Sequence, residues 1–346
     1  MSFSLTHEFG RFLRSPWSLH SKVKKEIGNK DPVEGGVSDN KLDGKAVADL
    51  DNRPILQLNA LPMTLSPENY KSPLSSANPN GSLNSLYAFS QLVNPVPNFT
   101  EHYEPGAFRI SSAYKNILYG ASALQKEKYV ESVIAEAREM YDFSSIANMN
   151  GAPGSWHPVY ATPIDWYDTT QAARFTEITL DLTGENAAEG PYQVLDNKEH
   201  HILSKFIKNG DKATLTDVDQ ESSIKYVKCK CLEVRLTRPW LSFDVLALGG
   251  WFLVGQEAGF VSSGRIDNNQ GIVPLIPTSL LVAINVDVSA DWSDKDRKIL
   301  DNGEKKGDQV AVGPFVLSSN ASPLAELHII GWVSQLVPLA PQVMHS

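Results

Sequence analysis

Regular alternation of apolar and polar residues is the feature that most constrains the fold of this chain. Residues 178–182 read ITLDL and residues 282–288 read VAINVDV, with an apolar residue at every second position. Such a period is typical of a β-strand with one buried face, because successive side chains point to opposite faces. Residues 226–236 also alternate, and a change of phase near Cys231 indicates a β-bulge. The second half of the chain is therefore predicted to be rich in half-buried strands.

Tryptophan placement and turn spacing extend this prediction. Six of the seven Trp residues follow residue 150, which places the main core in the C-terminal half. Further strands are predicted at residues 250–254, 310–317 and 327–337, separated by turns rich in Asp, Asn and Gly. Little helical pattern lies between them, which favours antiparallel pairing over parallel crossovers. We expect an α+β fold, mainly β, in which an antiparallel β-sandwich forms the C-terminal two-thirds and fills most of residues 155–340.

One segment has the period of a helix instead. From about residue 122 to residue 142, apolar residues recur at helical spacing, and Glu, Lys and Arg lie between them. This pattern predicts an amphipathic helix with a solvated charged face. Its apolar residues, from Tyr129 to Tyr141, are expected to pack on the sheet of the same chain. Docking of a partner is the alternative.

The N-terminal part of the chain has a different composition. Residues 28–105 are dense in Pro, Asn, Ser, Gly and Asp, which set turns and interrupt helices and strand ladders. Short apolar islands at residues 55–58 and 86–89 indicate contact with a neighbouring surface. We therefore predict an extended, loop-rich arm over residues 1–105 and a folded domain over residues 106–346. The arm either reaches a neighbouring subunit or is a loop-rich flank of the same domain.

Charge and hydropathy narrow the class of partner and the compartment. The formal net charge of −9 disfavours nucleic acid, since phosphate binding depends on Lys and Arg. The N-terminus lacks the uninterrupted apolar region of a secretory signal. The longest apolar stretch, residues 245–254, is too short to cross a bilayer as a helix. A cytoplasmic protein is expected, and unconventional export stays open.

Familiar catalytic motifs are missing from the sequence. It contains no G-x-S-x-G, G-x-G-x-x-G, phosphate-binding loop, H-E-x-x-H or C-x-x-C pattern. The two cysteines, Cys229 and Cys231, would point to the same face of a strand, but no further thiolate or imidazole ligand is near them in the sequence. We expect core thiols, with neither a metal nor a cofactor. The prediction leans away from an enzyme.

The segment that most resembles a catalytic site contains Asp165, Trp166 and Asp168. Two carboxylates that flank aromatic residues could combine acid and base chemistry with a stacking platform for a sugar ring. Pro163 before them and Thr169 after them favour a second interpretation, in which Asp168 or Thr169 caps a turn or helix. The second interpretation is preferred.

A second acidic group, Asp291, Asp294 and Asp296, follows a predicted strand. Three carboxylates within six residues offer oxygen ligands to calcium, but the central Gly and terminal Glu of an EF-hand loop are missing. An Asp or Ser that caps a short helix over residues 295–300 explains the same residues, and it is the preferred interpretation.

Three further residues are candidates for binding or assembly. Arg238 and Trp240 lie at the end of the longest strand, where Pro239 should stop pairing, and a local cation–π contact between them is expected. Trp332 begins an apolar tail over residues 332–344, which either closes the sandwich or offers an edge to another subunit. Residues 241–254 are expected in the core, with a membrane-seeking hairpin as the alternative.

These observations favour a non-enzymatic binding or self-assembling protein. Self-association through the N-terminal arm and the apolar tail is the expected partner contact. Two alternatives stay open: a toxin-like protein that meets membranes through residues 241–254, and a hydrolase that binds a carbohydrate with Asp165 and Asp168.

Overall fold

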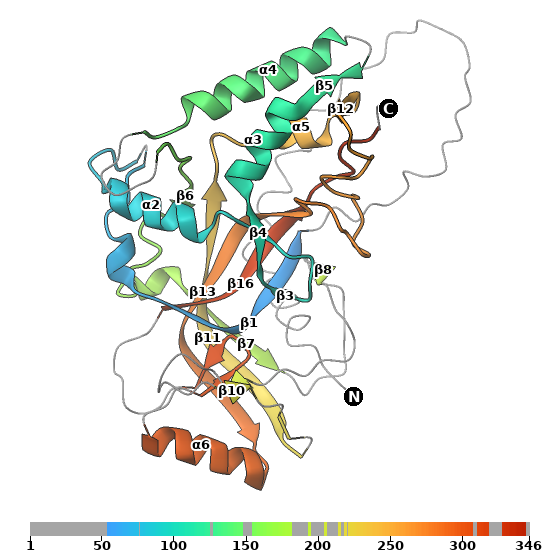
Figure 1. The fold of residues 1–346 in the computed structure, drawn as a ribbon. Coiled ribbons are helices and arrows are strands. Elements are labelled where there is room, and N and C mark those ends of the chain that lie inside the picture. Colours follow the sequence, from blue (N-terminus) through green and yellow to red (C-terminus); the bar gives the residue numbers. More distant parts are fainter. Residues whose placement is uncertain are drawn as a thin grey trace, which may run out of the picture.

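A single large β-sheet dominates the computed structural model (Figure 1). The structure describes residues 54–75, 77–124, 127–147, 154–181, 193–194, 204–205, 214–215, 218–219, 221–306, 310–317 and 327–343. The mainly β prediction with a few helices is confirmed.

The large sheet contains eight strands, in the order β3-β1-β16-β13-β11-β6, with β7 also paired to β11 and β8 to β1. Most neighbours are antiparallel, but β1 runs parallel to β3 and to β8. The sheet is therefore mixed and not purely antiparallel as predicted. The strands are β1 (Ile55–Leu65), β3 (His102–Tyr103), β6 (Tyr160–Thr162), β7 (Thr176–Asp181), β8 (Gln193–Val194), β11 (Ser223–Thr237), β13 (Leu275–Asp291) and β16 (Leu327–Leu336).

The remaining described strands form two-stranded ribbons and not a second large sheet. For this reason the sandwich is not confirmed. The ribbons pair β2 (Pro95–Pro97) with β4 (Pro105–Arg109), β5 (Ala121–Ala123) with β12 (Trp251–Leu253), β9 (Ser204–Lys205) with β10 (Thr214–Leu215), and β14 (Ala311–Val312) with β15 (Phe315–Val316).

Helices gather at one end of the large sheet, and one helix lies at the other end (Figure 1). The first group is α2 (Leu83–Leu92), α3 (Ile110–Gly120), α4 (Lys128–Phe143) and α5 (Phe243–Ala247), and the distant helix is α6 (Asp294–Lys306). The other helical elements among the described residues are two 3-10 turns, η3 (Pro67–Tyr70) and η5 (Ala172–Arg174).

The predicted helix over residues 122–142 is confirmed as α4, although it begins later. Residues 121–123 form β5 and pair with β12, so the helix starts only at Lys128. The buried residues of α4 recur at spacings of four and three, which makes one continuous stripe against the core. They are Val130, Ile134, Ala137 and Tyr141.

The change of phase in β11 has a different cause from the one predicted. Val227, Cys229 and Cys231 face one side of the sheet, whereas Leu232 and Val234 face the other, so the buried face changes while the alternation continues. A bulge does interrupt the pairing of β11 with β13, between Lys228 and Lys230. The extra residue is on β13, where Asn285 adopts a positive φ of 53°. Asn tolerates this left-handed conformation better than most residues.

Two apolar clusters cover the two faces of the sheet. The larger cluster lies between the sheet and the helices, and it contains Trp166, Trp240, Trp251 and Trp332, all fully buried. The smaller cluster lies on the opposite face and includes Phe315 from β15 together with both cysteines. Burial raises the pKa of Cys229 to about 12, which is consistent with the predicted core thiols.

The described part of the predicted arm belongs to this same core. Strand β1 lies between β3 and β16, and its Leu56 and Leu58 are buried. Tyr103 of β3 stacks on Trp332 of β16, with ring centroids 4.3 Å apart. The described residues between 54 and 105 therefore pair and pack with the strands and helices that follow them in the sequence. Residues 1–53 lie outside the described residues.

The apolar tail closes the core of its own chain as far as residue 341. Val337 and Ala340 are buried, and Ser262 binds both: its hydroxyl donates to the Val337 carbonyl, and its carbonyl accepts from the Ala340 amide. Among the apolar residues of this stretch, Leu339 keeps the largest exposed fraction, 42%. Residues 344–346 lie outside the described residues.

Residues 241–254 also contribute apolar side chains to the core. Val245 and Leu246 of α5 and Trp251 of β12 are buried, and Val254 is exposed at the turn that follows. Among the described residues, none of the helices has the length and apolar character needed to cross a membrane.

Buried tyrosines should make the fold sensitive to alkali. Burial raises the pKa of Tyr114 and of Tyr141 to about 12 and also raises that of Tyr103. An unfolded chain releases these protons near pH 10, so ionisation favours the unfolded state above that pH. We expect the free energy of unfolding to fall from pH 10 towards pH 12, measured by urea denaturation. Tyr141→Phe should make this fall shallower, whereas Tyr129→Phe, at an exposed position, should not. Equal slopes for Tyr141→Phe and the unmodified protein would contradict this account.

Candidate functional site

The loop with Asp165, Trp166 and Asp168 follows β6, and both of its carboxylates have local partners. Asp165 forms an ion pair with Arg174 of η5. Asp168 accepts hydrogen bonds from the Thr170 hydroxyl (2.6 Å) and the Thr170 amide (3.0 Å). These two bonds lower the pKa of Asp168. In the structure, Asp168 therefore caps the turn.

Trp166 is buried and is not an exposed stacking platform. Its ring lies 5.2 Å from the ring of Tyr70 and 5.4 Å from that of Phe89, between centroids. Only 1% of its surface is accessible. A sugar ring could reach its face only if these neighbours moved.

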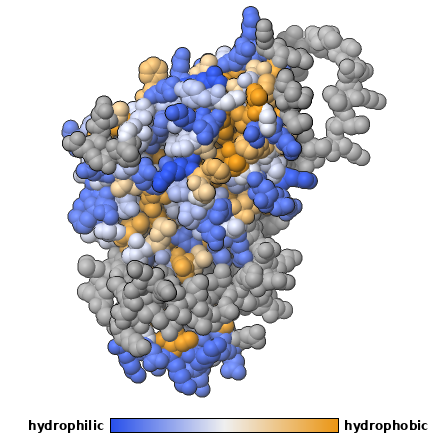
Figure 2. Space-filling view, in the orientation of Figure 1, coloured by the Kyte–Doolittle hydropathy of each residue, from blue (hydrophilic) through white to orange (hydrophobic). Residues whose placement is uncertain are grey.

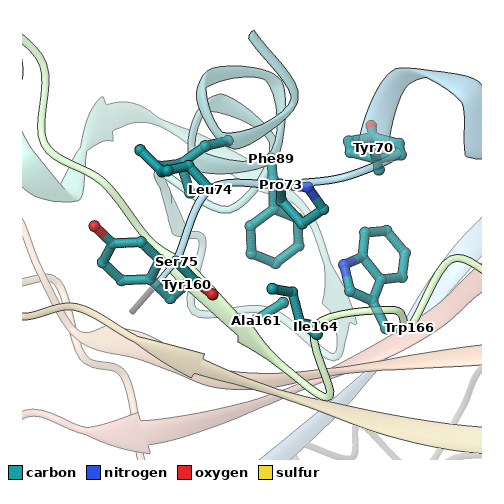
Figure 3. A pocket seen from close by; sticks show the side chains of 10 residues that line it. Tyr70, Pro73, Leu74, Ser75, Phe89, Tyr160, Ala161, Ile164 and Trp166 are labelled. Carbon is teal, nitrogen blue, oxygen red and sulfur yellow. The ribbon is translucent and has the colours of Figure 1, made fainter. Parts of the chain in front are cut away.

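A small pocket lies beside this aromatic group (Figure 3). It holds about 260 Å³ of non-protein space, part of it open to solvent, which is below the usual range for a ligand site. Figure 3 shows Trp166 and Tyr70 on one side, Tyr160 on the other, and the Phe89 ring between them. None of the described residues that line the pocket carries a carboxylate. The lining residues are Tyr70, Pro73, Leu74, Ser75, Leu86, Phe89, Tyr160, Ala161, Ile164 and Trp166.

Arg238 and Trp240 are buried, and their side chains donate hydrogen bonds to backbone carbonyls of other segments. The Arg238 guanidinium donates to the carbonyl oxygens of Pro277 and of Val93, the latter at 2.8 Å. The Trp240 indole donates to the Pro158 carbonyl at 2.7 Å. Among the described residues, a cation–π contact joins Arg138 to Tyr119. The cation–π contact expected between Arg238 and Trp240 does not form. Arg238 instead joins three separate segments.

Trp332 of β16 is also buried, and its side chain also makes a hydrogen bond to a distant segment. Its indole donates to the Asn59 side-chain oxygen at 3.1 Å. The six candidate residues thus lie in three separate places, the loop after β6, the turn after β11 and the centre of the sheet. They do not converge on one site.

The acidic group at α6 lies at the start of a helix that Ser293 caps. The Ser293 hydroxyl accepts from the Asp296 amide at 3.2 Å, and Asp296 accepts from the Ser222 hydroxyl at 2.6 Å. Asp291 pairs instead with Lys225, at 2.8 Å. In the part of the chain that the structure describes, no three His, Cys, Asp or Glu residues are grouped to hold a metal ion. The capping interpretation therefore holds, with Ser293 as the cap.

The most distinctive surface is a second apolar stripe on α4, which we call the outer stripe. It consists of Tyr129, Val133, Met140 and Phe143. These residues follow one another at spacings of four, seven and three, so they share one side of the helix. The sequence analysis placed the first three with the buried face. The structure separates the two stripes: the inner one is buried in the core, whereas Tyr129, Met140 and Phe143 are exposed. Val133 is half-buried and packs against the core, as predicted.

Exposure makes this outer stripe unusual. Tyr129 is 72% exposed, Phe143 87% and Met140 39%. The two aromatic rings alone present roughly 300 Å² of accessible surface. Helix α4 lies at one extremity of the molecule in Figure 1, and Figure 2 shows apolar side chains among charged ones at this end. An exposed apolar patch of this kind is typical of an interaction site.

The helix that carries the outer stripe is held firmly in place. Arg138 donates to the Leu118 carbonyl at 2.8 Å and to the Ala121 carbonyl at 3.0 Å, which ties α4 to the C-terminal end of α3. The Tyr141 hydroxyl donates to the Ser111 carbonyl at 3.0 Å. The outer stripe is therefore presented by a rigid element, which lowers the entropic cost of binding.

Comparisons with known proteins found no match: no family model, no curated protein and no solved structure is similar to this chain.

Substitutions in the loop after β6 test whether Trp166 and Asp165 have structural roles. Trp166→Ala should lower the free energy of unfolding by about 3–5 kcal/mol, because it removes a fully buried ring. Asp165→Asn should cost at most about 1 kcal/mol, since its ion pair with Arg174 is partly exposed. Urea denaturation measures both. A Trp166→Ala protein of unchanged stability would show that the ring is not part of the core.

Proposed function

We propose that this chain is a non-enzymatic binding or self-assembling protein, and that the outer stripe of α4 is its contact surface. The single observation that carries the proposal is the exposure of Tyr129 and Phe143 on a rigid helix. Tyr, Phe and Met are enriched at protein interfaces, and buried aromatic anchors supply much of the binding energy there.

The proposed contact surface lies at a different place from the one expected from the sequence. The apolar tail is engaged with Ser262 in its own core, and residues 54–105 are part of the same sheet and helix packing. Helix α4 thus replaces the tail and the described part of the arm as the proposed interface.

The two alternatives have weaker support. A carbohydrate hydrolase would need Asp165 and Asp168 to be directed at a ligand, and both are engaged with Arg174 and Thr170. A membrane-seeking hairpin would need the apolar side chains of residues 241–254 to leave the core. No observation favours either alternative as strongly as the outer stripe favours a protein contact.

Site-specific photo-crosslinking tests the proposal. Phe143 is replaced by the photoreactive amino acid p-benzoylphenylalanine in the full chain, within the cells that produce it. Phe108 of β4, which is 52% exposed, is the matched control position. We expect a discrete adduct from position 143 and little from position 108, because only the first lies in the contact surface.

A second substitution makes this result specific. Tyr129→Glu places a charge in the same stripe and should abolish the adduct at position 143 while circular dichroism stays unchanged. Equal crosslinking at positions 108 and 143, or none at either, would contradict the proposed interface.

A further inference from the structure

We infer that the outer stripe of α4 binds a segment of another protein that carries a lysine or arginine in the middle of an apolar face. This inference rests on the proposed function and names the class of its partner. It comes from Glu136, which lies within the outer stripe. Residues 129, 136 and 143 follow one another at intervals of seven, which is close to two helical turns. Glu136 therefore lies midway between Tyr129 and Phe143 along one side of the helix.

Glu136 is exposed, and among the described residues it forms no ion pair. The residues one turn away on either side of it are Ser132, Val133, Glu139 and Met140. None of these is basic, and Glu139 adds a second negative charge. Arg138 of the same helix donates instead to the carbonyl oxygens of Leu118 and Ala121.

A partner that covers both aromatic rings of the outer stripe must also cover the carboxylate between them. Removing a carboxylate from water is strongly unfavourable unless a cation pairs with it. Tyr129 and Phe143 lie on either side of Glu136, so the partner needs its cation between two apolar groups. A lysine or arginine with apolar residues on both sides, along one face of a segment, meets this requirement.

Two other occupants fit this surface less well. If a second copy of α4 covered the whole stripe, in either direction, the two Glu136 carboxylates would meet at its centre and repel each other. The interior of a membrane offers no cation to Glu136, and the headgroups of anionic lipids would repel both Glu136 and Glu139. The charges therefore favour a basic and apolar protein segment.

The length of the outer stripe also limits the partner. From residue 129 to residue 143 a helix rises about 21 Å, and a helical segment of about 15 residues covers that length. The two aromatic rings present roughly 300 Å², which is below the roughly 800 Å² that each partner buries in a standard interface. We expect a dissociation constant in the micromolar to millimolar range.

Two labelled synthetic peptides, added to the full chain, test this chemistry. Both are helical, are about 15 residues long and carry leucine at the two ends of one face, with uncharged polar residues elsewhere. One has arginine in the middle of the leucine face and the other has glutamate there. Fluorescence anisotropy measures their binding. We expect the arginine peptide to bind at least about tenfold more tightly than the glutamate peptide, because only the first pairs with Glu136.

Charge reversal at the centre of the outer stripe should exchange these preferences. In Glu136→Lys the glutamate peptide should bind more tightly than the arginine peptide, since the charge that each peptide meets has changed sign. Glu131→Lys is the matched control: it makes the same change at an exposed position of α4 outside the outer stripe. It should leave both dissociation constants within about twofold.

Three results would overturn the inference. The first is no binding of the arginine peptide up to about 1 mM. The second is an equal effect of Glu136→Lys and Glu131→Lys, which would indicate attraction to the net charge of the protein alone. The third is binding to phosphatidylcholine vesicles that Glu136→Lys leaves unchanged, which would assign the outer stripe to a lipid surface.

The photo-crosslinking experiment separates this inference from the proposed function. An adduct at position 143 that persists in Glu136→Lys would keep α4 as a protein interface, but it would show that the partner does not depend on a cation opposite Glu136.

Discussion

The rest of the structure depends on the insertion of β16 between β1 and β13. Residues 327–334 are all buried, and they pair with the N-terminal strand on one side and with the longest strand on the other. Strands β16 and β1 approach each other closely at Gly331, where an added Cβ would lie 2.8 Å from a methyl carbon of Leu58. The central sheet is therefore complete only when a strand near the end of the chain has joined one near the beginning of its described part.

Several polar groups that accompany this central pairing find hydrogen-bond partners across long distances in the sequence. The side-chain amide of Asn59 makes two hydrogen bonds: its Nδ2 donates to the Ile329 carbonyl at 2.8 Å, and its Oδ1 accepts from the Trp332 indole. Arg238 joins the end of α2 to β13 through two backbone carbonyls. A buried polar group without a partner would cost free energy, so these bonds also select one arrangement of the strands. The residues that first suggested binding, Arg238, Trp240 and Trp332, are used for this purpose.

Helix α4 illustrates how a stable core and a contact surface share one element. Its inner stripe packs against the core, and Arg138 ties it to α3. The outer stripe can then remain exposed without loss of structure, because the position of the helix does not depend on it. This separation is why substitutions in Tyr129 and Phe143 can test binding while leaving the fold intact.

Local patterns in the sequence determined the elements that depend on near neighbours. The period of two identified β7, β11 and β13, the helical spacing identified α4, and the Ser and Asp residues before α6 indicated its cap, because each involves contacts within a few residues. Only the tertiary structure decided the order of the strands, the inclusion of β1 in the central sheet, and which stripe of α4 is buried. These features depend on contacts between distant segments. Tyr129 and Val130 are equally apolar in the sequence pattern, and only the position of the core makes one a surface residue and the other a core residue.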